Sequence, residues 1–140
     1  MFKTRLINAL ATFIPSVEGF RSHPYWDVSR YSWGYGTKAP GPTGTITRDH
    51  AFADMVTYLL DDYEILKPRI TRVLTVKQWA AYLSFSYNLG TDDALDMVPY
   101  INANDDAALR VQWMRYINSG GQVNPDLITR RQKEMALWFS

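Results

Sequence analysis

The first apolar positions of the chain recur at helical spacing. Leu6, Leu10 and Phe13 lie three or four residues apart, which predicts a helix over residues 3–13. Pro15 has no backbone N–H, so it fits poorly inside that helix and favours a second, short turn that it opens itself. The pattern therefore predicts a first helix and then a break before the next element.

Residues 20–46 have a different pattern. Aromatic residues are interleaved there with polar residues and glycines, which is typical of short antiparallel strands. A loop rich in proline and glycine follows at 39–44. We therefore expect a small antiparallel sheet in this stretch, and a helix that begins after Thr47, which can cap it.

From Thr47 onward the chain has helical character almost throughout. The predicted helices cover about 48–66, the segment from a Thr75–Gln78 capping box to Gly90, about 93–97, about 105–118, and 124 to about 139. The fold class expected is α+β and mostly helical. We expect one domain over 1–140, with a small sheet lobe at about 19–46 and a larger helical lobe at about 47–140 that includes the N-terminal helix. A cleft between the lobes is the expected place for a ligand.

Composition and charge narrow the classes of function. A chain of 140 residues that is 46% apolar and 14% aromatic can bury a core, which argues against disorder. Its 15 basic and 14 acidic residues give no global field to steer a polyanion, so we expect no nucleic-acid partner. The chain has no cysteine and only two distant histidines, so we expect no disulfide, no metal and no cofactor.

No segment approaches the roughly 18 uncharged apolar residues that a membrane span needs. The apolar run from Leu6 to Val17 is interrupted by polar residues and proline, and it lacks the small-residue cleavage pattern of a signal peptide. We therefore expect a soluble protein without a signal peptide or a transmembrane segment.

Two carboxyl groups, Glu18 and Asp27, lie nine positions apart among aromatic residues. Glycoside hydrolysis uses such a pair, in which one carboxyl protonates the leaving oxygen and the other attacks or activates water. Apolar neighbours favour the protonated form of a carboxyl, so Glu18, between Val17 and Phe20, is the better acid. Asp27, in a polar hairpin, is the better ionised partner. Spacing alone does not establish this function, because acidic residues most often lie on a solvated surface.

The residues around this pair form a longer pattern. Glu18-Gly19, Tyr25-Trp26-Asp27, Ser32 and Gly34-Tyr35-Gly36 follow one another in the chain. Together with residues 78–90 and 113–134, this pattern resembles the phage-type lysozymes of glycoside hydrolase family 24. That family has Glu-Gly, Tyr-x-Asp and a hydroxyl residue before Gly-x-Gly, then a long central helix and a closing motif. The resemblance covers roughly 6–138, and three motifs in the right order argue against chance.

The resemblance implies a lysozyme-like two-lobe fold and a role for each matching residue. Glu18 would be the catalytic acid, and Asp27 and Ser32 would position the attacking water. Ser32 stands where the family usually has threonine, and serine keeps the hydroxyl group. In the family an arginine of the last helices pairs with the catalytic glutamate, and either Arg130 or Arg131 would fit. The predicted substrate-binding residues are Tyr35, Tyr87 and Asn88.

The function that the resemblance implies is that of an endolysin-type lysozyme. It would hydrolyse the β-1,4 bond between N-acetylmuramic acid and N-acetylglucosamine in peptidoglycan. Whether the outcome is inverting or retaining depends on the distance between the two carboxyl groups and stays open. We expect a monomer that waits in the cytoplasm of a bacterial host. It would reach the periplasm and cell wall at lysis, through an opening made by a holin-type membrane protein.

Three other functions remain open at this point. A virion-associated lysozyme that helps genome entry would contain the same catalytic domain. A catalytically inactive peptidoglycan-binding module would not need Glu18, Asp27 and a hydroxyl at Ser32 together. A plain helical interaction domain would have no use for the string from Glu-Gly to Gly-Tyr-Gly.

Overall fold

The computed structural model describes all residues from 1 to 140. The α-helices are α1 (Phe2–Glu18), α2 (Arg48–Leu66), α3 (Val76–Leu89), α4 (Thr91–Asp96), α5 (Val98–Asn102), α6 (Asp106–Trp113) and α7 (Pro125–Trp138), and a 3-10 helix, η1 (Lys67–Arg69), follows α2. The strands are β1 (Arg21–Asp27), β2 (Arg30–Gly34), β3 (Thr37–Lys38), β4 (Asn118–Ser119) and β5 (Gln122–Val123).

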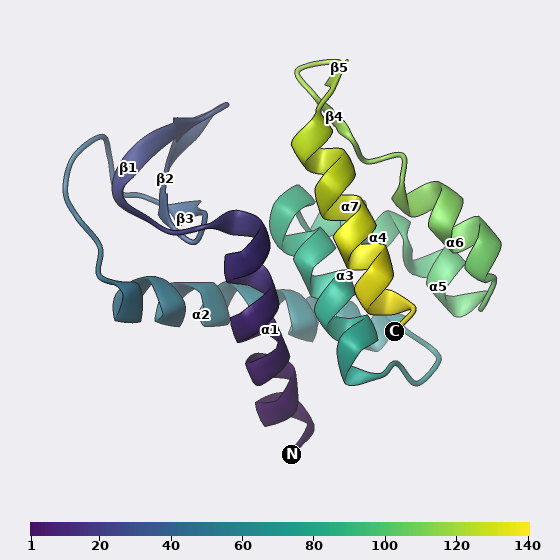
Figure 1. Cartoon of the computed structure of the whole chain (residues 1–140). Coiled ribbons are helices and arrows are strands. Elements are labelled where there is room, and N and C mark those ends of the chain that lie inside the picture. The colour runs from purple at the N-terminus through teal and green to yellow at the C-terminus, as the bar shows by residue number, and fades with distance from the viewer.

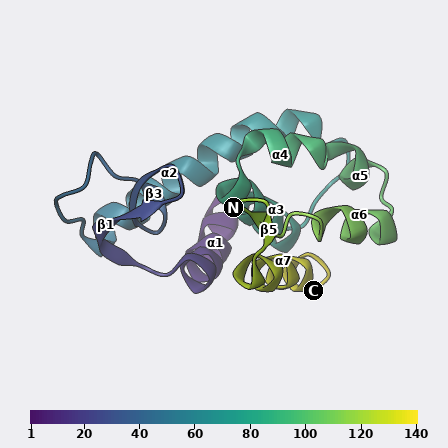
Figure 2. The same ribbon diagram turned by 90° about the horizontal axis from the view of Figure 1, so that it is seen from above.

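The elements form a small sheet at one end of the molecule and a group of helices at the other. The sheet is antiparallel with the order β1-β2-β3. Helix α2 extends from beneath this sheet to the helical end, as the two ribbon views show (Figure 1, Figure 2). The predicted class, α+β and mostly helical with a small antiparallel sheet, is confirmed. None of the helices combines the length and the apolar character that crossing a bilayer requires.

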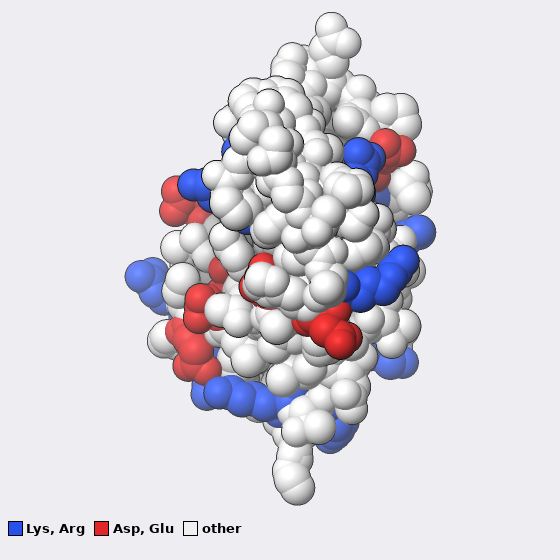
Figure 3. Space-filling model, turned by 90° about the vertical axis from the view of Figure 1, so that its left-hand side faces the viewer, with Lys and Arg blue, Asp and Glu red and all other residues white.

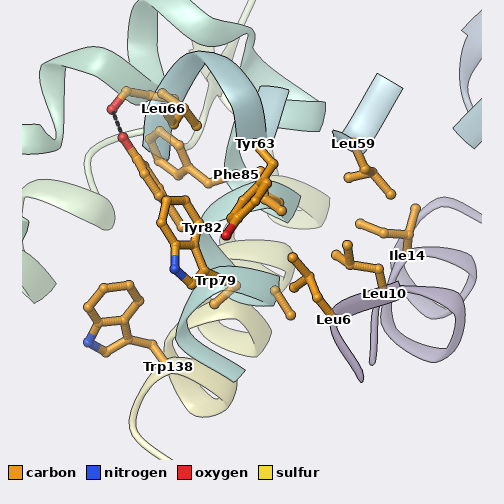
Figure 4. Close-up of a cluster of buried hydrophobic side chains, with 14 of the residues drawn as sticks. Leu6, Leu10, Ile14, Leu59, Tyr63, Leu66, Trp79, Tyr82, Phe85 and Trp138 are labelled. Atoms are coloured by element: carbon orange, nitrogen blue, oxygen red, sulfur yellow. Dashed lines mark hydrogen bonds between the residues drawn. The ribbon is translucent and has the colours of Figure 1, made fainter. Parts of the chain in front are cut away.

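Helix α3 lies at the centre of the hydrophobic core. Its residues from Trp79 to Ser86 are all buried, which is the pattern of a helix that is covered on every side. Helices α1 and α7 pack against it, and Leu6, Leu10 and Ile14 form the buried face of α1. Figure 4 shows these side chains on one side of the buried cluster, beside Tyr63 of α2 and Trp79 of α3, with Trp138 of α7 on the opposite side. The core thereby fixes the ends of α1, α3 and α7 relative to one another.

Helix α1 is longer than its sequence predicts. It continues through Pro15 and ends at Glu18, so the predicted break at Pro15 is wrong. Proline costs a helix one backbone hydrogen bond, but packing often overrides such local preferences. The burial of Ile14 against the core holds this last turn in place. The consequence is that Glu18 is carried on a rigid helix end.

Two other regions differ from the prediction. The short helix expected near residue 93 is a pair, α4 and α5, and the helix expected over 105–118 ends at Trp113. The residues after it form the β4–β5 hairpin, whose turn contains Gly120 and Gly121 with positive φ. Such short strands carry too few residues to show a periodicity in the sequence.

Candidate active site

Glu18 occupies the last position of α1, and its carboxyl group is largely buried. Its Oε2 forms an ion pair with Nη1 of Arg130 on α7, which settles which of the two candidate arginines is the partner. The C-terminal end of a helix carries partial negative charge, so a carboxylate there needs a compensating cation. Arg130 supplies that charge and also fixes the direction of the Glu18 side chain.

The turn between β2 and β3 lies directly against the Glu18 carboxyl. A Cβ atom at Gly36 would stand 2.8 Å from Oε1 of Glu18, which is closer than a Cβ atom approaches a neighbouring heavy atom in proteins. The φ angle of Gly36 is +96°, a conformation that favours glycine. The second glycine of the Gly-Tyr-Gly string therefore allows the backbone to touch the predicted acid.

Tyr87 of α3 joins the helical lobe to this turn. Its hydroxyl donates a hydrogen bond of 2.7 Å to the carbonyl oxygen of Tyr35. Burial, and next the negative charge of Glu18, raise the pKa of the Tyr87 hydroxyl above its ordinary value, so it stays a donor at neutral pH. The ring of Tyr35 is itself buried and packs on Phe20 at 5.4 Å between centroids. A contact of Tyr35 with substrate would therefore have to come from its backbone.

Asp27 and Ser32 lie together on the first two strands. The Ser32 hydroxyl donates a hydrogen bond of 3.4 Å to Oδ2 of Asp27. Asp27 is exposed whereas Ser32 is buried, so Ser32 is placed to hold the carboxylate. Tyr25 connects this pair with Glu18: burial raises the pKa of its hydroxyl, and so do the nearby charges of Asp27 and Glu18. Both predicted carboxyl groups therefore lie close enough to the Tyr25 hydroxyl to raise its pKa.

A fully buried carboxylate, Glu134, completes the ion pairs behind the site. Arg130 lies between Glu18 and Glu134, with its Nε 3.4 Å from Oε2 of Glu134. Arg131 is 2.7 Å from the other oxygen of Glu134 and donates to Oδ1 of Asn88 at 2.8 Å. Arg131 therefore fixes the orientation of the Asn88 amide. Sequence reasoning gave Glu134 no role, although its position one helical turn after Arg130 was a usable signal.

A polar cleft of about 340 Å³ opens beside these groups, between the β2–β3 turn and helices α2 and α3. Its lining includes Gly36, Tyr87 and Asn88, which the sequence had indicated. It also includes Arg30, Tyr58, Asp62 and Ser86, which sequence reasoning missed. On the face shown in Figure 3, basic and acidic side chains are interspersed, and no large area has a single sign.

Gly36→Ala tests the close contact between the turn and the acid. We expect the new methyl group to push the Glu18 carboxyl aside, and activity to fall by about 10²-fold, because a displacement near 1 Å can cost that much. Gly41→Ala is the matched control, since Gly41 has ordinary φ and no atom within 4 Å of the added Cβ. The measurement is the rate at which each variant releases soluble fragments from peptidoglycan. Equal activity of the two variants would show that the contact has no catalytic importance.

The chain matches known proteins over most of its length. The family model for phage lysozyme matches residues 15–134. The endolysin of Bacillus phage PZA is 32% identical over 147 aligned positions, covering 97% of this chain and 55% of that protein. The endolysin of Bacillus phage B103 is 29% identical over 138 positions, covering 91% and 51% respectively. The chain thus spans about half the length of the curated relatives it matches.

A solved structure shares the whole fold. The muramidase domain of SpmX from Asticaccaulis excentricus superposes with a TM-score of 0.83 at 25% sequence identity, and 95% of each chain is covered. The matched residues 15–134 contain Glu18, Asp27 and Ser32, and also Arg130 and Glu134 of α7. The family match therefore includes the sheet, the central helix and most of the closing helix. This chain belongs to the phage lysozyme family.

Proposed function

We propose that the chain is a lysozyme domain that hydrolyses peptidoglycan at the β-1,4 bond between N-acetylmuramic acid and N-acetylglucosamine. The observation that carries this proposal is the setting of Glu18. Its carboxyl is largely buried, is directed by Arg130 and touches Gly36 beside a polar cleft. Family membership and the muramidase domain among the structural neighbours support the same reaction.

In this reaction Glu18 donates its proton to the bridging oxygen as the bond from that oxygen to the anomeric carbon breaks. The oxygen of a water molecule bonds to the anomeric carbon, and the proton that the water loses passes to Asp27. Ser32 acts through Asp27, because its buried hydroxyl holds that carboxylate in place. Tyr87 and Asn88 border the cleft in which the glycan would lie.

The proposal extends to the setting of the enzyme. The 140 residues would act as one catalytic unit and as a monomer. Two relatives named endolysin support a role in lysis of the host from within. Such a role implies that a holin-type membrane protein gives the enzyme access to the cell wall.

Clearing of outer-membrane-permeabilised Gram-negative cells tests the proposed activity. We expect the protein to lower the turbidity and to release soluble fragments with new reducing ends. A protein that sediments with purified sacculi but releases nothing would be an inactive binding module. A protein that neither binds nor releases fragments would contradict the proposal altogether.

A further inference from the structure

The cleft is lined by one carboxyl group, Asp62, which the reaction above does not use. Asp62 of α2 lines the cleft and is half-buried. Its Oδ2 accepts a hydrogen bond of 2.8 Å from the Ser86 hydroxyl of α3, which fixes its orientation. No side chain other than Ser86 donates a hydrogen bond to this carboxylate, and no cation lies within ion-pair distance of it. The Asp62 carboxylate is therefore held in one orientation and can accept further hydrogen bonds.

An aromatic ring stands one helical turn before this carboxylate. Tyr58 and Asp62 are four residues apart on α2, so they share one face of the helix, and both line the cleft. The Tyr58 side chain is 44% exposed, although its ring meets the Tyr87 ring edge-on at 6.5 Å. An exposed aromatic face next to an oriented polar group suits a ligand that is apolar on one side and carries hydroxyl groups on its rim.

The charges of the cleft favour a neutral ligand. Arg30 of β2 lines the same cleft and donates to the Gly36 carbonyl at 3.3 Å, while it forms no ion pair. Asp62 and Arg30 therefore present one negative and one positive group. Such a cleft has no net field that would attract an amine or an acid. An N-acetylglucosamine residue of the glycan offers hydroxyl and acetamido N–H donors without charge.

We propose that Tyr58 and Asp62 form a sugar-binding subsite, in which Asp62 accepts a hydrogen bond from a hydroxyl or acetamido N–H of the glycan. The ring of that sugar packs on Tyr58. This inference rests on the proposed function, and it assigns part of the recognition of the glycan to helix α2. Ser86 is the positioning residue of the subsite, because it touches the Asp62 carboxylate and holds it toward the cleft.

Asp62→Asn is the variant that tests the subsite, and Asp61→Asn is its matched control. Asparagine keeps the size of the side chain and an oxygen for Ser86, but it removes the charge that strengthens a hydrogen bond to the sugar. Asp61 is the exposed neighbour that does not line the cleft. Binding would be measured by calorimetry with glycan strands that have been freed of their peptides by amidase digestion. A Glu18→Gln background would keep the strands intact.

We expect Asp62→Asn and Tyr58→Ala each to weaken binding of these strands by about tenfold, and Asp61→Asn to leave it within twofold. In the active protein, Asp62→Asn should raise KM by a similar factor and change kcat little. Ser86→Ala should raise KM by less, since the carboxylate remains. If thermal melting shows that Asp62→Asn is poorly folded, the KM of Ser86→Ala decides whether the subsite exists.

Three results would overturn the subsite. One is unchanged binding of the peptide-free strands by Asp62→Asn. Another is a loss of binding by Asp62→Asn that is confined to strands still carrying peptides, which would mean that Asp62 binds the peptide stem. The third is a fall in kcat at constant KM, which would place Asp62 in the chemical step. If the wild type binds the strands but cleaves nothing, the proposed function fails, and the binding comparison still decides the subsite.

Discussion

Glu18→Gln is expected to lower kcat on peptidoglycan by about 10³-fold, within the range that general-acid catalysis contributes. Glutamine keeps the shape of the side chain but has no proton to donate at the required strength. The fold should survive, because Arg130 keeps its contacts with Glu134 and with the carbonyl oxygen of Ser84 at 3.1 Å. The variant should therefore bind peptidoglycan and leave it uncut.

The control for this variant is Glu64→Gln. Glu64 is an exposed glutamate of α2 that pairs only with Lys3, at 3.3 Å, so the same chemical change there should leave kcat as it is. Both variants would be compared with the wild type by single-turnover release of reducing ends and by circular dichroism. A folded Glu18→Gln protein that keeps more than a tenth of the activity would remove Glu18 from the acid role.

Glu134→Gln is expected to lower the free energy of unfolding by about 3–5 kcal/mol, because it leaves buried cations without their counter-charge. The groups that contact the Glu134 carboxylate are all donors, namely Ser84 Oγ at 2.5 Å, Trp113 Nε1 at 3.1 Å, Arg130 and Arg131. An amide nitrogen in that position would face a donor wherever it turned. A loss of this size corresponds to a fall in Tm of about 10–17 °C.

The loss of Glu134 should also affect the reaction. Arg130 contacts both carboxylates, so the loss of Glu134 removes one of the contacts that hold Arg130 in place, and Arg130 in turn directs the Glu18 side chain. Urea unfolding would measure the stability of Glu134→Gln beside that of Glu64→Gln, which should stay within about 0.5 kcal/mol of the wild type. Equal stability of the two variants would mean that the buried pairs contribute little.

Several features of the fold could be predicted because they depend on neighbouring residues. Thr75 and Gln78 form both hydrogen bonds of the capping box that opens α3. Thr47 and Asn124 cap α2 and α7 through their side chains, as expected. The alternation of aromatic and polar residues indicated the sheet. Each of these signals lies within a few residues and needs no tertiary contact.

The parts that could not be predicted depend on residues far apart in the chain. The Glu18–Arg130 pair spans 112 positions, and no local pattern distinguishes Arg130 from Arg131 on the closing helix. Asp62 enters the cleft only because α2 packs beside α3, and it looks like any exposed helix carboxylate in the sequence. Tyr35 was expected at the substrate because of its neighbours, but its ring is turned into the core.

The linkage that is cut is best identified from the ends of the products. Peptidoglycan would be digested with the wild-type protein, reduced with borohydride and hydrolysed to its amino sugars. We predict new muramitol, because hydrolysis at the proposed bond leaves N-acetylmuramic acid as the reducing end. Glucosaminitol in its place would mean that the other glycosidic bond is cut. Anhydro-muramic ends, which are not reducible, would mean that no water enters the reaction, and either result would contradict the proposed hydrolysis.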